Sequence, residues 1–364
     1  MSKQQERWVI KAGSSLVAGK DDGINKSFIK DLVLQVQQLV NEGIQVVIVS
    51  SGAVAKGMYE LDLTERPNSL NLLQAAAAIG QLGLIEGYKT EFLNFEIKTA
   101  QVLISHDDIS SRTRYLNARN SLLTLLELRV VPIINENDSV SIEEISFGDN
   151  DALAGAIVGL VDADRLIMLT DEEGVFSQDP KENKNVKLLN RINLDDQSNQ
   201  IDKITEGKPG ILGRGGMKTK IKAARLSLDA GAQTWVANGN DPDVLTKVLK
   251  GQEVGTFFEG SRDKRQSRKT WIASLGSPKG QLIIDDGAAK AIKEGGSSLL
   301  PVGITALKGE FKKGDLVACQ SQNKEVARGF SNFNASELNQ IIGLKSKEIN
   351  SKLGYTSAEE VIHR

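Results

Sequence analysis

Residues 135–151 read NENDSVSIEEISFGDND, and this stretch decides the expected fold. Polar residues stand together at 135–138 and again at 149–151, with the apolar run VVPII (130–134) before them and ALAGAIVGLV (152–161) after them. A buried strand therefore ends in one polar cluster, and a second polar cluster opens a helix. Ligands of open α/β sheets bind at the carboxyl ends of strands. We therefore expect a site for a small polar ligand here, together with Mg²⁺, which prefers oxygen ligands.

A simpler interpretation treats the same stretch as two ordinary Asn/Asp turns, with Asp149 as the N-cap of the following helix. One N-cap requires one carboxylate or amide side chain. The two clusters supply seven such side chains, so a ligand site is the favoured interpretation.

Strand and helix patterns alternate from about residue 7 to residue 260. Continuous runs of Val and Ile, typical of strands buried in a parallel sheet, alternate with apolar residues at helical spacing. The predicted strands are 8–11, 44–49, 99–105, 130–135, 165–171 and 232–237, and the predicted helices are 28–40, 70–87, 116–128, one from 151, 217–231 and 241–250. This alternation predicts an α/β fold with a mostly parallel open sheet sandwiched by helices.

The pattern changes after residue 260. The segment RDKRQSRK (262–269) holds five basic residues and one acidic residue, which is typical of a linker. Beyond it, QLIID, GITAL, DLVAC and KEVARGF are short β-type runs separated by glycine and charged residues. They predict a small β-rich, barrel-like C-terminal domain. We expect a catalytic domain at 1–260, a basic linker at 261–277, the small domain at 278–354 and a tail at 355–364.

Composition excludes several classes of function. Among 364 residues, 45 basic residues nearly balance 47 acidic ones, so the chain carries no global signal for binding a polyanion. Its one cysteine, Cys319, excludes an internal disulfide framework or a thiolate metal cluster. The N-terminus lacks the apolar segment of a signal peptide, and no apolar run reaches membrane-spanning length. We expect a cytoplasmic protein without a membrane partner.

The motifs that remain favour phosphoryl transfer. The chain has no G-x-x-x-x-G-K-[ST] motif, no G-x-G-x-x-G after the first strand and no H-E-x-x-H. Instead, glycine loops at KAGSS (11–15), SSGAVAKG (50–57) and GILGRGG (210–216) precede helices, whose N-terminal N–H groups can face a phosphate. Lysines can stabilise the charge on a transferring phosphoryl group. With only two histidines in the chain, a carboxylate acceptor is attractive, because it is already ionised and needs no general base.

These motifs resemble a known family. KAGSS, IVSSGAVAKG, NARNSL, PIINENDSV, FGDNDALA, LTDEEGVFSQDP and GGMKTKIKAA are similar to motifs of the amino-acid kinase family. Within it, the resemblance is to the kinases that phosphorylate the side-chain carboxylate of L-glutamate. In the tail, IDDGAAKAI, GSSLLPVGI, GEFKKGDLV and ARGFSNF resemble a PUA domain.

The resemblance implies the reaction ATP + L-glutamate → ADP + L-glutamyl 5-phosphate, with Mg²⁺, as the first step of proline biosynthesis. It also implies feedback inhibition by proline and a homo-oligomer, a dimer or a tetramer. We assign no side chain as a direct ligand of Mg²⁺.

The resemblance also assigns roles to single residues. Lys11 and Lys220 match the lysines that neutralise the transferring phosphoryl group, and Asp151 matches the acidic residue that organises the catalytic groups. The glutamate-binding positions match Ser51, Asp138 and Asn150. The ATP-binding positions match Lys11, Thr170, Asp171, Arg214, Gly215, Gly216, Met217, Lys218, Thr219 and Lys220. The family often has small hydroxyl residues where Arg214 and Lys218 stand, which leaves the roles of these two residues open.

Two alternatives stay open. A kinase for another small carboxylate or for carbamate would carry the same motifs, because pocket shape decides the substrate. An RNA-binding protein is suggested by the PUA-like tail. Residues 279–364 hold 12 basic and 10 acidic residues, a net charge of +2 (12 − 10), and RNA binding requires a clear basic face. The charge of the tail therefore does not support RNA binding, and the basic linker keeps it open only as a secondary contact.

Overall fold

The computed structural model describes residues 5–105, 108–109, 112–140, 150–178, 186–195, 216–260, 278–295, 297–322, 324–354 and 358–362. The chain forms two compact units, with most residues up to 267 in the first and those from 268 in the second. The proposed linker, 261–277, lies outside the described residues, so its boundaries stay a prediction.

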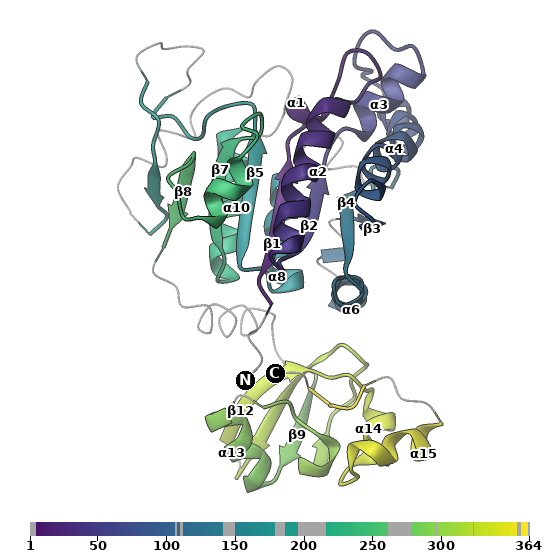
Figure 1. Ribbon diagram of the computed structural model, residues 1–364. Helices are drawn as coiled ribbons and strands as arrows, with labels where there is room; N and C mark the ends of the chain where they lie inside the picture. Colours follow the sequence, from purple (N-terminus) through teal and green to yellow (C-terminus); the bar gives the residue numbers. More distant parts are fainter. Residues whose placement is uncertain are drawn as a thin grey trace. The chain divides into compact units, whose positions relative to one another are not determined.

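The first unit is built on an eight-stranded sheet with the strand order β3-β4-β2-β1-β5-β7-β8-β6 (Figure 1). Its strands are β1 (Arg7–Ala12), β2 (Gln45–Ser50), β3 (Lys98–Ile104), β4 (Val130–Glu136), β5 (Arg165–Thr170), β6 (Arg191–Asn193), β7 (Gln233–Asn238) and β8 (Thr256–Glu259). Every neighbouring pair is parallel except β7 and β8. The predicted mostly parallel sheet is confirmed, and β6 and β8 are additions that the sequence patterns did not predict.

Six helices of this unit correspond to the predicted helices, with ends shifted by up to six residues, and the short helices α1 and α3 are additions. The helices are α1 (Ser14–Val17), α2 (Lys26–Asn41), α3 (Ala53–Glu60), α4 (Leu70–Leu93), α6 (Arg112–Glu127), α8 (Asp151–Val161), α10 (Met217–Asp229) and α11 (Val244–Leu249). The second helix begins two residues before its predicted start, after Asn25, whose side chain accepts a hydrogen bond from the Phe28 N–H (3.1 Å). This is the ordinary action of an Asn N-cap.

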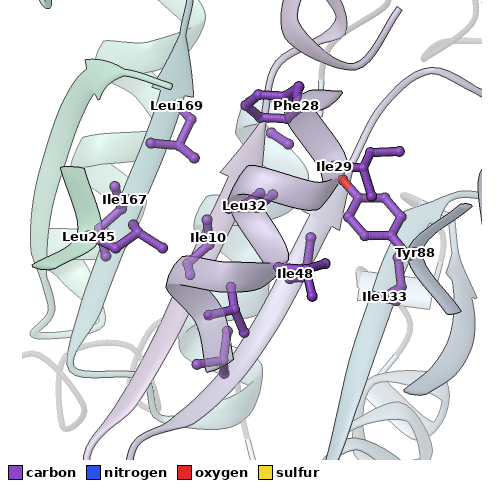
Figure 2. Packing of buried hydrophobic residues seen from close by; sticks show 14 of the residues in the cluster. Ile10, Phe28, Ile29, Leu32, Ile48, Tyr88, Ile133, Ile167, Leu169 and Leu245 are labelled. Atoms are coloured by element: carbon purple, nitrogen blue, oxygen red, sulfur yellow. The ribbon is translucent and has the colours of Figure 1, made fainter. Parts of the chain in front are cut away.

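The two faces of the sheet are covered by different helices. Successive side chains of a strand point to opposite faces, and in β1 the residues Trp8, Ile10 and Ala12 join the apolar cluster that includes α2 and α11. Figure 2 shows Ile10 lying with Leu32 of α2 in this cluster. Lys11 is out of phase with these residues, so its side chain lies on the opposite face, where α8 packs on β1.

Helices α8 and α10 pack closely against each other on that face. A Cβ added at Gly155 of α8 would lie 2.9 Å from the carbonyl oxygen of Ala223 in α10. A side chain at this position would force the two helices apart. The glycine therefore allows the beginnings of α8 and α10 to lie close together, and both beginnings carry predicted site residues.

The second unit has its own sheet and its own core. Strands β9 (Gly280–Ile284), β10 (Ile304–Lys308), β11 (Leu316–Ser321) and β12 (Lys324–Phe330) form a sheet of order β10-β9-β11-β12. These are the four predicted β-type runs, and the predicted β-rich domain is confirmed. The short helices are α13 (Asp286–Gly295), η1 (Pro301–Gly303), α14 (Ala335–Ile341), η2 (Ser346–Glu348) and α15 (Ile349–Leu353), which the sequence patterns did not predict.

An apolar cluster that includes Leu282, Cys319 and Phe333 fills this second unit. At the start of α14, Asn334 and Glu337 form a reciprocal capping box, with Asn334 Oδ1 accepting from the Glu337 N–H and Glu337 Oε2 accepting from the Asn334 N–H. Such a box defines where a helix begins. Neither unit contains, within its described residues, a helix both long and apolar enough to span a bilayer.

Candidate active site

The carboxyl ends of four neighbouring strands, in the order β4-β2-β1-β5, carry polar residues that were predicted to form the site. Strand β4 ends in Asn135 and Glu136, β2 runs into Ser51, β1 ends beside Lys11, and β5 runs into Asp171. Because these strands are parallel, their carboxyl ends lie along the same edge. This is the edge where open α/β sheets bind ligands.

A buried carboxylate between two lysines forms the centre of the site. Lys11 Nζ lies 2.5 Å from Asp151 Oδ1, and Lys220 Nζ lies 3.3 Å from Asp151 Oδ2. The Asp151 side chain is fully buried, and those of Lys11 and Lys220 are 8% and 12% exposed. The structure thus brings together the three predicted catalytic residues, which lie 140 and 69 positions apart in the sequence (151 − 11 and 220 − 151).

Each of these residues is held by an element of the fold. Lys11 projects from β1 onto the face that α8 covers, and Asp151 is the first residue of α8. Lys220 stands in the first turn of α10, beside Thr219. The Thr219 hydroxyl lies 3.0 Å from Asp151 Oδ2 and 2.7 Å from the Gly216 carbonyl oxygen, both of which can accept its proton. The start of α10 is therefore bonded directly to the start of α8.

The electrostatics of this centre favour an anion. Burial by itself would raise the pKa of Asp151, but the Lys11 and Lys220 ammonium groups and the Thr219 hydroxyl outweigh it and hold that pKa well below its usual range. Asp151 is therefore ionised at neutral pH. Two ammonium groups and one carboxylate leave a net charge of one positive unit (+1 +1 −1) in a mostly buried position. Such a position stabilises the charge of a transferring phosphoryl group.

A network of side-chain amides lies beside the lysines. Asn150 Nδ2 donates to the Ser50 carbonyl oxygen (2.8 Å), to Ser51 Oγ (3.2 Å) and to Asn135 Oδ1 (2.8 Å). Asn135 Nδ2 in turn donates to Gln81 Oε1 (2.8 Å). The structure therefore brings together Ser51 and Asn150, two of the three residues predicted to bind the amino acid.

A second group of contacts joins the ends of β1 and β5. Ser15 Oγ donates to Asp171 Oδ1 (2.9 Å), and Thr170 Oγ1 lies 3.2 Å from the same oxygen. The Gly13 N–H donates to the Leu169 carbonyl oxygen (3.1 Å), which closes the loop after β1 onto β5. Thr170 and Asp171, both predicted to bind the nucleotide, are thus placed next to the first glycine loop.

Other predicted residues have less defined places. Asp138 lies in the turn after β4 and is partly exposed, and its role as a ligand of the amino acid stays a prediction. Gly216 and Met217 begin α10, and Lys218 is exposed on its first turn. Arg214 and Gly215 lie outside the described residues, as do Asp149 and His106.

Three buried residues of the site were not assigned a role from the sequence. Asn135 belongs to the polar cluster at 135–138, so the sequence indicated that it lies in the site but not which residues it contacts. Gln81 and Tyr88 lie in the long, largely apolar helix α4, and Tyr88 OH is 3.0 Å from Ser50 Oγ. Only the packing of α4 over the ends of β2 and β4 brings them to the site.

Comparison with known proteins now identifies the family. Residues 6–238 match the model of the amino acid kinase family. The chain belongs to the amino acid kinase family. The matched range includes all three members of the Lys11–Asp151–Lys220 centre and the whole amide network. Residues 280–353 match the PUA domain, which covers the second sheet.

Three relatives that match this amino acid kinase over its full length share one name. A protein named Glutamate 5-kinase from Nitrosococcus oceani is 44% identical over 363 residues, covering 100% of this chain and 96% of that protein. Proteins of the same name from Hydrogenovibrio crunogenus and Saccharophagus degradans are 44% and 46% identical over 362 and 363 residues, covering 99% and 100% of this chain and 96% of each relative. Among solved structures, the UMP kinase from Bacillus anthracis is 17% identical, with a TM-score of 0.48, and the match covers 71% of this chain and 97% of that one.

Proposed function

We propose that this kinase transfers the γ-phosphoryl group of ATP to the side-chain carboxylate of L-glutamate and forms L-glutamyl 5-phosphate, the first step of proline biosynthesis. The observation that carries the chemistry is the buried centre in which Lys11 and Lys220 share Asp151. The choice of glutamate is supported by full-length relatives named for that substrate.

The chemistry requires little from the protein beyond position and charge. The attacking oxygen belongs to a carboxylate with an intrinsic pKa of about 4.3, so it is already ionised at neutral pH and no base has to remove a proton. Charge on the transferring group is stabilised by the ammonium groups of Lys11 and Lys220. Asp151 holds both ammonium groups in place because each of its oxygens contacts one of them. Asp151 is thus a positioning residue for the lysines.

Mg²⁺ fits this arrangement as a partner of ATP. Within the described ranges, no group of three or more His, Cys, Asp or Glu side chains could hold a metal ion. Both oxygens of Asp151 already contact lysines, and Mg²⁺ is commonly held by substrate phosphates and water. When bound with ATP, the ion would neutralise charge on the phosphates.

The amide network supplies the amino-acid side of the site. Ser51 Oγ accepts a hydrogen bond from Asn150, so its own proton is available to a carboxylate of the substrate. Asp138 offers a negative charge for the α-ammonium group. Proline carries the same α-carboxylate and a protonated amine, so competition by proline at an overlapping site is part of the proposal.

Self-association is also part of the proposal. Strand β3 is an edge strand of the sheet, and Leu103 on it and Leu82 on α4 are exposed. Exposed edges and exposed leucines favour contact with another copy of the chain. Light scattering of the purified chain would give the number of copies.

The reaction is tested by trapping its product. The purified chain is incubated with ATP, Mg²⁺, hydroxylamine and one amino acid at a time. Hydroxylamine converts an acyl phosphate into a hydroxamate, which forms a coloured complex with Fe³⁺. We expect hydroxamate and ADP in equal amounts with L-glutamate, and at most traces with L-aspartate or carbamate. ADP formation with another carboxylate in preference to glutamate would refute the proposed substrate, while leaving the carboxylate kinase chemistry intact.

A further inference from the structure

Three side-chain amides form an unbroken chain from the interior of α4 to the start of α8. Gln81 Oε1 accepts from Asn135 Nδ2 at 2.8 Å, and Asn135 Oδ1 accepts from Asn150 Nδ2 at 2.8 Å. All three residues are more than nine-tenths buried. The substrate-binding residue Asn150 is thus connected, through Asn135, to a glutamine to which no role has been given.

One backbone atom identifies the nitrogen and the oxygen of all three amides. Asn150 places a polar atom 2.8 Å from the Ser50 carbonyl oxygen, which can only accept a hydrogen bond, so that atom must be the nitrogen. The same nitrogen lies 2.8 Å from Asn135, which must therefore present its oxygen. Asn135 then turns its nitrogen to Gln81, and Gln81 must present its oxygen. Flipping any one amide would place two donors or two acceptors against each other.

The remaining atoms have opposite properties at the two ends of this chain. At the outer end, no described residue donates a hydrogen bond to Asn150 Oδ1, so this oxygen is available to a donor such as an ammonium group. At the inner end, Gln81 Nε2 is buried and has no hydrogen-bond partner among the described residues. A buried unpaired donor costs about 1–3 kcal/mol. A methionine would fill the same space without that cost, so the property that only glutamine supplies here is the acceptor for Asn135.

We propose that Gln81 is a positioning residue for the amino-acid substrate. It holds the Asn135 amide in one orientation, and Asn135, together with the Ser50 carbonyl oxygen, holds Asn150 with its oxygen toward the α-ammonium group. The inference rests on the proposed function, because it takes an amino acid as the occupant of this side of the site. Gln81 itself, buried in α4, does not touch the substrate.

The test compares two identical substitutions at buried glutamines. Gln81→Met removes the acceptor for Asn135. The Asn135 amide can then turn, which leaves the Ser50 carbonyl oxygen as the main acceptor that holds the Asn150 amide. Gln35→Met is the matched control, because Gln35 is also buried, accepts from the Leu245 N–H (3.0 Å) and lies on α2, outside the site. Loss of one well-placed hydrogen bond corresponds to roughly a tenfold change in binding. We expect Gln81→Met to raise KM for glutamate about tenfold, with KM for ATP and kcat within about threefold.

The control and a conservative variant separate positioning from structural damage. Gln35→Met should lower the melting temperature and leave KM for glutamate unchanged. Gln81→Glu keeps an oxygen facing Asn135 Nδ2, so it should bring KM for glutamate back to within about threefold of the unaltered chain. If Gln81→Met does not fold, Gln81→Glu still tests the proposal, because a tenfold higher KM in that variant would overturn it.

Other outcomes are equally decisive. Suppose that the unaltered chain makes hydroxamate with glutamate. An unchanged KM for glutamate in folded Gln81→Met, or equal rises in KM for glutamate and for ATP, would then overturn the positioning role of Gln81. Absence of hydroxamate from the unaltered chain with glutamate would instead overturn the proposed function, and with it the role of Gln81.

Discussion

Replacing Asp151 by asparagine tests the central electrostatic argument. The substitution keeps the shape of the side chain and removes its charge, which leaves the ammonium groups of Lys11 and Lys220 in a mostly buried position without a counter-ion. Removing one partner of a buried ion pair typically costs 3–5 kcal/mol, because the remaining charge stays buried and uncompensated. For a domain of this size each kcal/mol lowers the melting temperature by about 2–4 °C, so we expect a decrease of about 6–20 °C.

Asp22 provides the matched control for this experiment. It also contacts two lysines, Lys26 and Lys56, each at 2.6 Å, but its side chain is 32% exposed. Water screens the Asp22 carboxylate, and such pairs contribute at most about 1 kcal/mol. The Lys56 side chain is 10% exposed, but it keeps Glu60 Oε1 at 3.2 Å as a second counter-ion when Asp22 loses its charge. Asp22→Asn should therefore shift the melting temperature by only a few degrees, although it removes the same charge from the same number of lysines.

The pH dependence of the melting temperature gives a second test of the ion pairs that Asp151 makes with the two lysines. The ammonium groups hold the pKa of Asp151 below its usual range in the folded chain. Its stabilising contribution is thus fully present above the unfolded pKa of about 3.9 and is lost as the pH falls through the lower folded-state pKa. The difference in melting temperature between the unaltered chain and Asp151→Asn should be constant from about pH 5 to 7 and shrink only in strong acid. Equal melting temperatures for Asp151→Asn and Asp22→Asn at pH 7 would refute the argument.

Three further predictions concern the lysines, the inhibitor and the second unit. Lys11→Ala and Lys220→Ala should each lower kcat on the order of 100-fold with a much smaller change in KM, and an unchanged kcat in either folded variant would remove its assigned role. Asp138→Ala should raise both KM for glutamate and the proline concentration that halves the activity, and a rise in only the first would contradict a shared site. A chain ending at Gly260 should fold and still form hydroxamate, because every assigned residue precedes that point; a folded but inactive product would mean that residues 278–354 supply a catalytic group.

Much of the fold could be predicted from local pattern. Short apolar runs rich in Val and Ile predicted six strands of the large sheet, and apolar residues at helical spacing predicted its longer helices. Strands β6 and β8 were missed for a physical reason. Arg191–Asn193 and Thr256–Glu259 are only three and four residues long, so neither shows a period, and both depend on pairing with strands that are distant in the sequence.

The residues of the site also fall into two groups, those that the sequence predicted and those that it did not. Lys11, Asp151 and Lys220 were assigned through motifs, because each stands at a strand end or a helix start whose local sequence is distinctive. Gln81 could not be predicted, since a single glutamine in an apolar helix gives no sign of which strand end it will meet. Its role depends on α4 passing close to α3, where a Cβ added at Gly80 would lie 2.0 Å from the Ala53 carbonyl oxygen. Such a contact is a property of tertiary packing and leaves no periodic trace in the sequence.

The adjacent residues Asn150 and Asp151 connect the two halves of the site. Asn150 belongs to the amide network proposed to bind the amino acid, and Asp151 contacts the two lysines proposed to stabilise the phosphoryl group. Since one peptide bond joins them, the proposed roles make the first turn of α8 the element that sets the distance between the acceptor carboxylate and the transferred phosphoryl group. That turn is fixed from one side by the Ser50 carbonyl oxygen at the end of β2 and from the other by Thr219 at the start of α10. An in-line transfer depends on this alignment of the two reactants, so a displacement of α8 would disturb both reactants at once, whereas a change confined to Gln81 should disturb only the amino acid.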